Sequence, residues 1–193
     1  MKRTLSTVLT IIFIATPVCA ETLGSGPLDS VQQLLREIRQ IKPDPSEEQK
    51  KHSQYALSLL NVAVISKKAL GKYWSKLSEA DHEKFQVLLG KLFVHVAFPS
   101  SAKFFNDLDL VYGQTKEKKT VNVVPLRVVH EKEGEVGIDF HLILNKNKWQ
   151  VVDVILDGVS MRNNLRSQFY KVIKKKDYNE LIRKMDKKLI ASQ

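Results

Sequence analysis

The sequence predicts a single α+β domain in which helices come first, a twisted antiparallel sheet of about four strands follows, and helices return at the C-terminus. Two observations indicate this order. Apolar residues recur every three to four positions through residues 29–107 and again through 161–190. Between these regions, residues 110–156 are rich in β-branched and aromatic residues and are punctuated by turn residues. With 193 residues and 43% hydrophobic content, the chain is long enough for one compact core.

The first twenty residues have the pattern of a cleavable secretory signal. Lys2 and Arg3 precede a short apolar run at 8–15, and small residues follow up to Ala20. We expect residues 1–20 to be a signal peptide, 21–28 a flexible segment and 29–193 the folded domain, in a soluble monomer of the periplasm. Acylation of Cys19 is the alternative, but a lipoprotein signal usually has a small residue where this chain has Val18.

Export to the periplasm limits the kinds of partner that the basic charge can attract. The net charge of +10 (31 minus 21) suits any polyanion, including nucleic acid, anionic lipid or an acidic protein. A periplasmic protein does not meet nucleic acid, so we expect no nucleic-acid partner. Cys19 is the single cysteine of the chain, and cleavage after Ala20 would leave a domain without a disulfide or a thiolate metal site.

The N-terminal helices are marked by caps and proline stops. Asp29 can cap a first helix that reaches about residue 41, where two prolines follow. Ser46 begins a capping box that predicts a helical region over 47–75, with a bend at Gly71. Ser78 can cap the next helix, which we expect to stop at Pro99 before a short helix over 101–107.

The strands are expected at 120–131, 135–145 and 148–156, with a further edge strand at 110–115. Turn residues separate the first three, which predicts an antiparallel meander. Pro125 cannot donate a ladder hydrogen bond, so its strand should be an edge or carry a bulge there. Helical patterning resumes over 161–174 and 178–190.

Alternation assigns the faces of these strands. Phe140, Leu142 and Leu144 fall on one face of the middle strand, whereas His141 falls on the other. The strand over 148–156 is apolar on both faces under strict alternation, so both must be covered or must line a cavity. Ordinary core packing and a ligand cavity are both consistent with this pattern.

No catalytic or metal-binding constellation is evident in the sequence. The five histidines lack metal-ligand spacing, and there is no glycine-rich phosphate loop or nucleophile elbow. Ser160 has no identifiable base partner. A run of lysines at 171–176 is either a solvated helix face or a contact for anionic headgroups or an acidic partner. The sequence therefore favours a binding protein over an enzyme, with no metal and no cofactor.

Three segments in register resemble the MlaC family of periplasmic proteins, also called the toluene-tolerance auxiliary family. The C-terminal part of the sheet reads WQVVDVILDGVSM at 149–161 and is followed by RSQF at 166–169. The segment VPLRV at 124–128 is similar to a family strand, and ALGKYW at 69–74 is similar to a family helix segment. The similarity covers most of residues 30–188.

The resemblance implies a phospholipid-binding shuttle that contributes to outer-membrane lipid asymmetry as the soluble component of an ABC transport system. Family members hold acyl chains in an apolar cavity between the sheet and the helices. The implied partners are phospholipid, an inner-membrane ABC transporter complex with an MCE-domain protein, and an outer-membrane lipoprotein–porin complex. Phe98-Pro99 and the lysine-rich C-terminal region depart from the family pattern, which leaves the docking contacts open.

On this interpretation we assign candidate residues to two parts of a lipid site. The tails would contact apolar residues of the sheet and of the helices, and the headgroup would lie at a mouth near the turn after the last long strand. The predicted mouth residues are Arg127, Gly158 and Ser160. The predicted lipid-binding residues are Tyr73, Trp74, Phe93, Leu126, Val128, Phe140, Leu142, Val152, Val154 and Val159.

Three other functions remain open from the sequence. The protein could bind another apolar ligand, such as an isoprenoid or hopanoid precursor, or it could be a lipid hydrolase that uses Ser160. It could also be a structural adaptor, which would carry no ligand. The lipids extracted from the purified protein and the effect of Ser160→Ala distinguish these alternatives.

Overall fold

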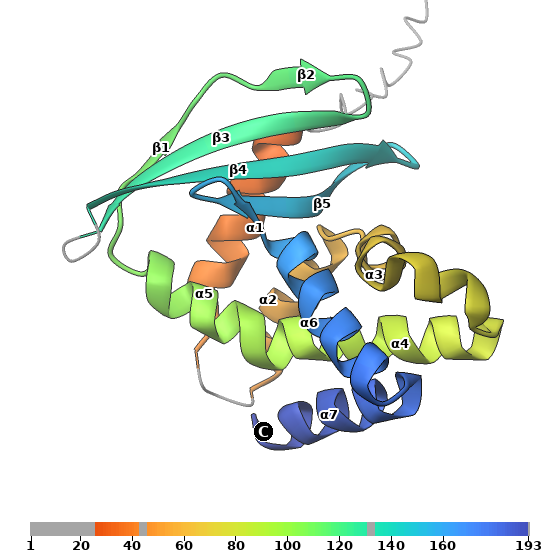
Figure 1. Ribbon diagram of the computed structural model, residues 1–193. Helices are drawn as coiled ribbons and strands as arrows, with labels where there is room; N and C mark the ends of the chain where they lie inside the picture. Colours follow the sequence, from red (N-terminus) through yellow and green to blue (C-terminus); the bar gives the residue numbers. More distant parts are fainter. Residues whose placement is uncertain (1–25, 43–45, 131–133, 193) are drawn as a thin grey trace, which may run out of the picture.

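The computed structural model describes residues 26–42, 46–130 and 134–192. The predicted signal peptide and Cys19 lie outside these residues. Figure 1 shows the sheet on one side of the molecule, with the helices packed beneath it. This arrangement confirms the predicted single α+β domain with helices before and after the sheet.

Ser46 caps the second helix as predicted, whereas the first helix is capped by Gly26 and Asp29 lies within its first turn, where its carboxylate accepts from the Gly26 N–H. Helix α1 (Pro27–Gln40) and α2 (Glu47–Ser58) begin close to the expected residues. The predicted helical region 47–75, however, is divided into α2, α3 (Val62–Leu70) and the short 3₁₀ helix η1 (Gly71–Lys76). The first break arises because the Asn61 N–H donates to the Val151 carbonyl, and the Val151 N–H donates to Leu59. Asn61 then caps α3 through its side chain, which accepts from the Val64 N–H at 2.9 Å.

The next helix is longer than the sequence predicted. Helix α4 (Glu79–Leu92), a π turn η2 (Phe93–Ala97) and α5 (Phe98–Phe105) form one continuous helix, so Pro99 does not end it. The π turn pairs the Phe98 N–H with the Phe93 carbonyl and places Pro99 in the first turn of α5, where a missing N–H is tolerated.

This continuous helix is long and apolar enough, by length and composition alone, to cross a bilayer. Within the domain it packs against α1, α2, α3 and α7. Phe85, Leu88 and Leu89 are buried among these neighbours. It is therefore the central helix of the folded domain.

The long strands lie where the sequence placed them. The sheet order is β1-β3-β4-β5-β6, all antiparallel, and β2 also pairs with β3. Pro125 is accommodated because the outer neighbour of β3 is interrupted there: β2 pairs with residues 121–123 and β1 with 126–128. The strands are β1 (Leu110–Tyr112), β2 (Lys116–Lys118), β3 (Val121–His130), β4 (Gly134–Asn145), β5 (Lys148–Leu156) and β6 (Val159–Ser160).

A β-bulge in the β4–β5 pairing changes which residues of β5 share a face. Phe140 lies opposite Val154, but the register shifts between His141 and Leu142, so Leu142 lies opposite Val151. One extra residue on β5 places Val151 and Val154 on the same side of the sheet. The strict alternation that the sequence predicted for this strand is therefore wrong.

The two C-terminal helices agree closely with the sequence pattern. Helix α6 (Met161–Lys175) is capped by Ser160, whose Oγ accepts from the Asn163 N–H at 3.0 Å. Helix α7 (Tyr178–Ile190) is capped by Asp177. Helix α6 packs on α3 and β5, and α7 packs on α4 and α6, so these helices complete the core beneath the sheet.

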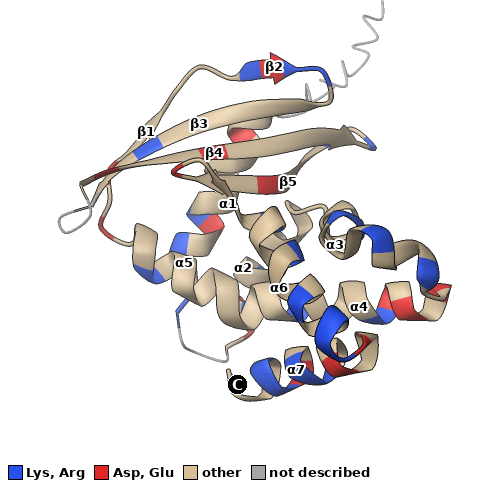
Figure 2. Cartoon of the chain, viewed as in Figure 1, with Lys and Arg blue, Asp and Glu red and all other residues tan. Residues whose placement is uncertain are grey.

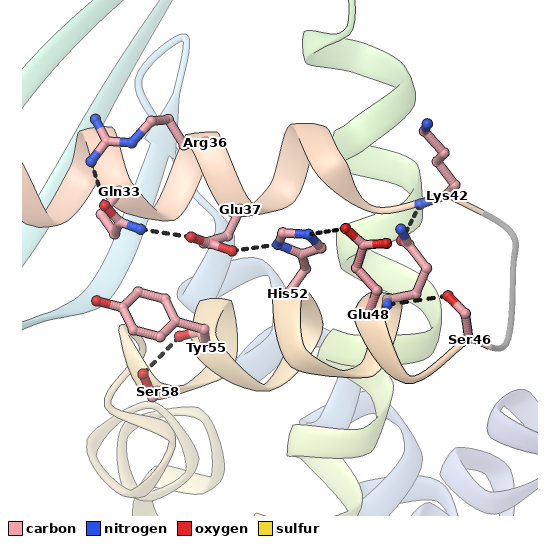
Figure 3. Close-up of polar contacts among 10 residues, drawn as sticks. Gln33, Arg36, Glu37, Lys42, Ser46, Glu48, His52, Tyr55 and Ser58 are labelled. Carbon is pink, nitrogen blue, oxygen red and sulfur yellow. Dashed lines mark hydrogen bonds and ion pairs between the residues drawn. The ribbon is translucent and has the colours of Figure 1, made fainter.

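A chain of polar contacts joins α1 to α2 (Figure 3). The His52 Nδ1 lies 2.6 Å from the Glu37 carboxylate, whose other oxygen accepts from Gln33 at 2.6 Å. The Gln33 side chain also accepts a hydrogen bond from Arg36. Glu48 approaches the other nitrogen of the His52 ring, with 4.0 Å between the atoms. These contacts fix the relative position of the first two helices on the outer side of the apolar core.

Candidate functional site

The inner face of the sheet is a continuous apolar surface. Leu126 and Val128 of β3 and Phe140 and Leu142 of β4 lie on this face, and each is at most 3% exposed. The buried stripe of α1 contributes to the same core, and α1 packs against β3 and β5. That stripe consists of Val31, Leu34, Leu35 and Ile38.

The bulge places Val152 and Val154, the two β5 residues that were predicted to bind lipid, in different surroundings. Val154 packs against the core opposite Phe140. Val152 is buried, but it is not part of the core cluster that includes Val151. A single extra residue in the strand is the physical reason, and composition alone carries no signal for it.

The predicted helix residues also separate into two places. Trp74 and Phe93 pack against the apolar core, and the Trp74 ring stacks on His82 with 3.8 Å between centroids. Tyr73 instead meets Tyr170 of α6, edge to face, at a centroid distance of 4.8 Å. The structure thus places Trp74 and Phe93 at the apolar core among the helices, whereas Tyr73 belongs to a contact between η1 and α6.

Side chains fill the space between the sheet face and the helices in this structure. The inner residues of β3 and β4 are almost fully buried by apolar neighbours. Within the part of the chain that the structure describes, these residues form an apolar core, and no enclosed cavity is seen in front of them.

An open groove lies elsewhere, among the helices. This groove of about 1070 Å³ runs between α2 and the α4–η2 segment and reaches Ser192. Leu57, Val62 and Val94 supply apolar surface, and none of the predicted site residues lines it. Sequence reasoning missed this groove because its lining is divided among separate helices, whose relative placement the periodicity does not give. The charged or titratable residues along it are Lys42, Lys50, Lys91 and His95.

The predicted mouth residues lie at one end of the sheet. Arg127 pairs in register with Gly137, which exchanges two hydrogen bonds of 2.9 Å with Asp157. Gly158 follows in the turn with a φ of +79°, a conformation that favours glycine. Val159 is exposed beside this turn. The Arg127 side chain is itself exposed and lies 3.3 Å from Glu135.

Ser160 has a structural environment rather than that of a nucleophile. Its Oγ donates to the Asp153 carboxylate at 2.7 Å and accepts from the first turn of α6. Asp153 is buried and also lies 3.2 Å from the Arg162 guanidinium. A serine nucleophile needs a base such as imidazole to take its proton, whereas Ser160 is bonded directly to a paired carboxylate.

The histidine opposite Asp153 in the β4–β5 register is His141. Burial lowers the pKa of His141, although Asp153 opposes this shift. Within residues 26–42, 46–130 and 134–192 there is no group of three or more His, Cys, Asp or Glu residues placed to hold a metal ion.

Comparison with known proteins identifies the family. The family model described as "MlaC protein" matches residues 28–187, which is nearly the whole folded domain. The chain belongs to the MlaC family. The resemblance predicted from three sequence segments is therefore confirmed.

Two relatives extend the comparison of this MlaC-family chain. It is 25% identical over 194 residues to the intermembrane phospholipid transport system binding protein MlaC of Haemophilus influenzae, covering 94% of this chain and 89% of that protein. It also resembles the solved structure of a phospholipid-binding protein of Ralstonia solanacearum in complex with a phospholipid. That match has a TM-score of 0.71 at 19% identity and covers 86% of this chain and 98% of the other, which establishes a shared fold.

Proposed function

We propose that this protein binds a phospholipid and carries it, as a soluble periplasmic shuttle, between the outer and inner membranes. The observation that carries this proposal is the family match over residues 28–187. The names of the two relatives support it, since one is a phospholipid transport protein and the other was solved with a phospholipid. The domain itself supplies apolar surface on facing elements.

The acyl chains occupy the interior between the sheet and the helices. The candidate contacts are the inner residues of β3 and β4, together with Val154, Trp74 and Phe93. Because these residues are packed in the present structure, the sheet and the helices must separate for the tails to enter. Arg127 and the turn at Gly158 lie at one end of the sheet, where a phosphate group can remain in water.

The energetics of transfer suit a carrier without catalytic residues. Removing an acyl chain of about 16 carbons from water is worth on the order of 12 kcal/mol, at about 0.8 kcal/mol per CH₂ group. Release into water is therefore slow. Transfer into another apolar conduit is nearly neutral because the tails never meet water, so delivery depends on docking to partner complexes in each membrane.

The partners that fit this role are the MCE-protein/ABC transporter complex of the inner membrane and the lipoprotein–porin complex of the outer membrane. A periplasmic location follows from the predicted signal at residues 1–20. The exposed lysines of α6 and α7 give the surface a positive charge, which Figure 2 shows along both helices. Such a surface favours acidic partners or anionic headgroups.

Mass spectrometry of the purified protein tests the proposal directly. Native spectra should show a bound mass that solvent extraction identifies as a phospholipid with two acyl chains. An isoprenoid or hopanoid as the dominant ligand, or protein that is always empty, would contradict the proposal. Ser160→Ala should leave the bound lipid intact, because removing one helix cap costs stability of about 1 kcal/mol but no chemistry.

A further inference from the structure

The surface where η1 meets α6 is built around a glycine turn. Gly71 has a φ of +49° and a ψ of −119°, and a Cβ placed there would lie 2.4 Å from the Tyr170 Oη and 2.7 Å from Arg166. This backbone conformation is one that L side chains rarely adopt. It allows the Lys72 N–H to donate to the Tyr170 Oη at 2.9 Å. The turn therefore joins two elements about a hundred residues apart in sequence.

Two cations are gathered around the ring of Tyr170. The Lys72 Nζ lies 5.8 Å from the ring centroid, and the Arg166 guanidinium carbon lies 5.3 Å from it. The Lys72 Nζ is also 5.4 Å from the centroid of the Tyr73 ring. Both cations are exposed, so the aromatic faces offset only part of the repulsion between them.

This cluster contains positive charge without an internal counter-charge. Among the ion pairs of the described residues, none within 4.0 Å involves Lys72 or Arg166. The Tyr170 Oη accepts from the Lys72 N–H and, at 3.4 Å, from Arg166. Its own proton is not used in these bonds and can be donated outward. The Lys72 ammonium, the Arg166 guanidinium and the Tyr170 hydroxyl are thus three donors gathered at one tyrosine ring.

The pKa of Tyr170 reflects the same arrangement. Burial raises this pKa, but the hydrogen bonds from Arg166 and the Lys72 N–H outweigh burial and bring it below its ordinary value. The local environment therefore stabilises negative charge at this position.

We propose that Lys72, Arg166 and Tyr170 form a binding site for the phosphate of an anionic phospholipid headgroup at a membrane surface. Arginine and lysine at one point match the charge of a phosphate, and the tyrosine hydroxyl adds a donor. Two tyrosines interleaved with these cations suit the bilayer interface, where aromatic rings with polar tips and basic side chains collect. Exposed Lys67 and Lys68 in the last turn of α3 extend the positive surface beside the cluster.

This site is separate from the apolar interior proposed for the carried lipid. Tyr73 contacts Tyr170 and Lys72, whereas the neighbouring Trp74 packs against the core. The site would guide the protein onto a membrane and leave the bound tails untouched. Its failure can therefore be distinguished from failure of the proposed lipid-carrying function.

Binding to vesicles of phosphatidylglycerol and phosphatidylethanolamine in equal parts tests the site, with the purified, lipid-loaded protein. The double variant Lys72→Gln with Arg166→Gln should bind about 30-fold more weakly, because each basic residue near an anionic surface strengthens binding about fivefold. Tyr170→Phe should lose roughly fivefold, the range of one hydrogen bond. Arg166→Lys should keep most of the binding, since it retains the charge.

A matched control removes the same two charges at another place. Lys103→Gln with Lys116→Gln changes α5 and β2, which lie away from α3 and α6 in Figure 2. This control should weaken vesicle binding less than about threefold. All variants should keep the circular dichroism and the bound phospholipid of the wild type.

Three results would contradict the proposed phosphate-binding site. The first is equal vesicle binding by the double variant and the control. The second is a shift of the Tyr170 ring signals by inorganic phosphate while vesicle binding stays independent of the cluster, which would indicate a site for soluble phosphate. The third is unchanged vesicle binding with loss of a co-purifying acidic protein, which would assign the cluster to a protein partner.

Discussion

The interior face of the sheet and the groove between α2 and α4 differ in a way that bears on how a lipid is held. The interior is apolar throughout and closed, with Leu142 fully buried. The groove is open, with a volume of about 1070 Å³, and Lys42, Lys50 and Lys91 lie along it. Both regions therefore offer apolar surface, and they differ in that the interior is closed whereas the groove is open and lined in part by lysines.

Open volume alone therefore does not mark a site for acyl chains. A chain laid in the groove would remain beside water and lysine side chains, and would lose part of the gain from burial. A chain in the interior would gain the full transfer free energy, but it must first displace packed side chains. The proposed function assigns the tails to the interior and requires that the helices move when lipid enters.

The largest expected effect comes from Leu142→Ala. This change should reduce the unfolding free energy of the delipidated protein by about 2–5 kcal/mol, because it leaves a cavity in a packed core. Leu144→Ala is the matched control on the same strand and face, since Leu144 is 56% exposed; we expect a change within about 0.5 kcal/mol. Urea unfolding measures both. Equal effects of the two substitutions would contradict the description of the interior as closed and the end of β4 as open.

A substitution at the groove should instead raise the unfolding free energy. Gly90 lies in α4 at the groove, and a Cβ there would meet Leu57 at 3.6 Å, an ordinary contact. Gly90→Ala should therefore raise the unfolding free energy by about 0.5–1 kcal/mol, because alanine is the better helix former. Bound phospholipid, measured by extraction, should not change. Loss of lipid with a stable fold would instead place the tails in the groove.

The smallest expected effect is a pH-dependent change in stability at His82, whose ring stacks on Trp74. A hydrogen bond to the Trp74 carbonyl raises the pKa of His82, and Glu79 adds to this while burial opposes it. A group whose pKa is raised on folding stabilises the protein below its unfolded pKa of about 6.5, and this contribution disappears as the pH rises through the folded value. The Tm difference between wild type and His82→Gln should therefore be larger at pH 5.5 than at pH 8. An equal difference at both pH values would show that the stack, and not the charge, is what His82 contributes, and a difference that grows toward pH 8 would contradict the raised pKa.

Most of the secondary structure could be predicted because caps and periodicity act locally. The β5 strand (Lys148–Leu156) and α7 (Tyr178–Ile190) have the predicted bounds. Pro99 misled the prediction because a π turn upstream lets the helix continue, and that turn has no local signature. The break near Asn61 depends on backbone hydrogen bonds to Val151, which lies far along the chain.

The candidate site was predictable in part for the same reason. Alternation in β4 correctly placed Phe140 and Leu142 on the inner face, whereas the bulge in β5 separated Val152 from Val154. The groove and the cluster around Tyr170 depend on how helices pack. Gly71 was visible only as a bend; the need for glycine there arises from Tyr170, almost a hundred positions away.

Photo-crosslinking with a phospholipid that carries a diazirine on its acyl chain tests the central claim most directly. The protein is loaded with this lipid and irradiated, and the modified residues are located by mass spectrometry. We expect adducts on the inner residues of β3 and β4, Leu126, Phe140 and Leu142 foremost. Adducts confined to Leu57, Val87 and Val94 would place the acyl chains in the groove and contradict it.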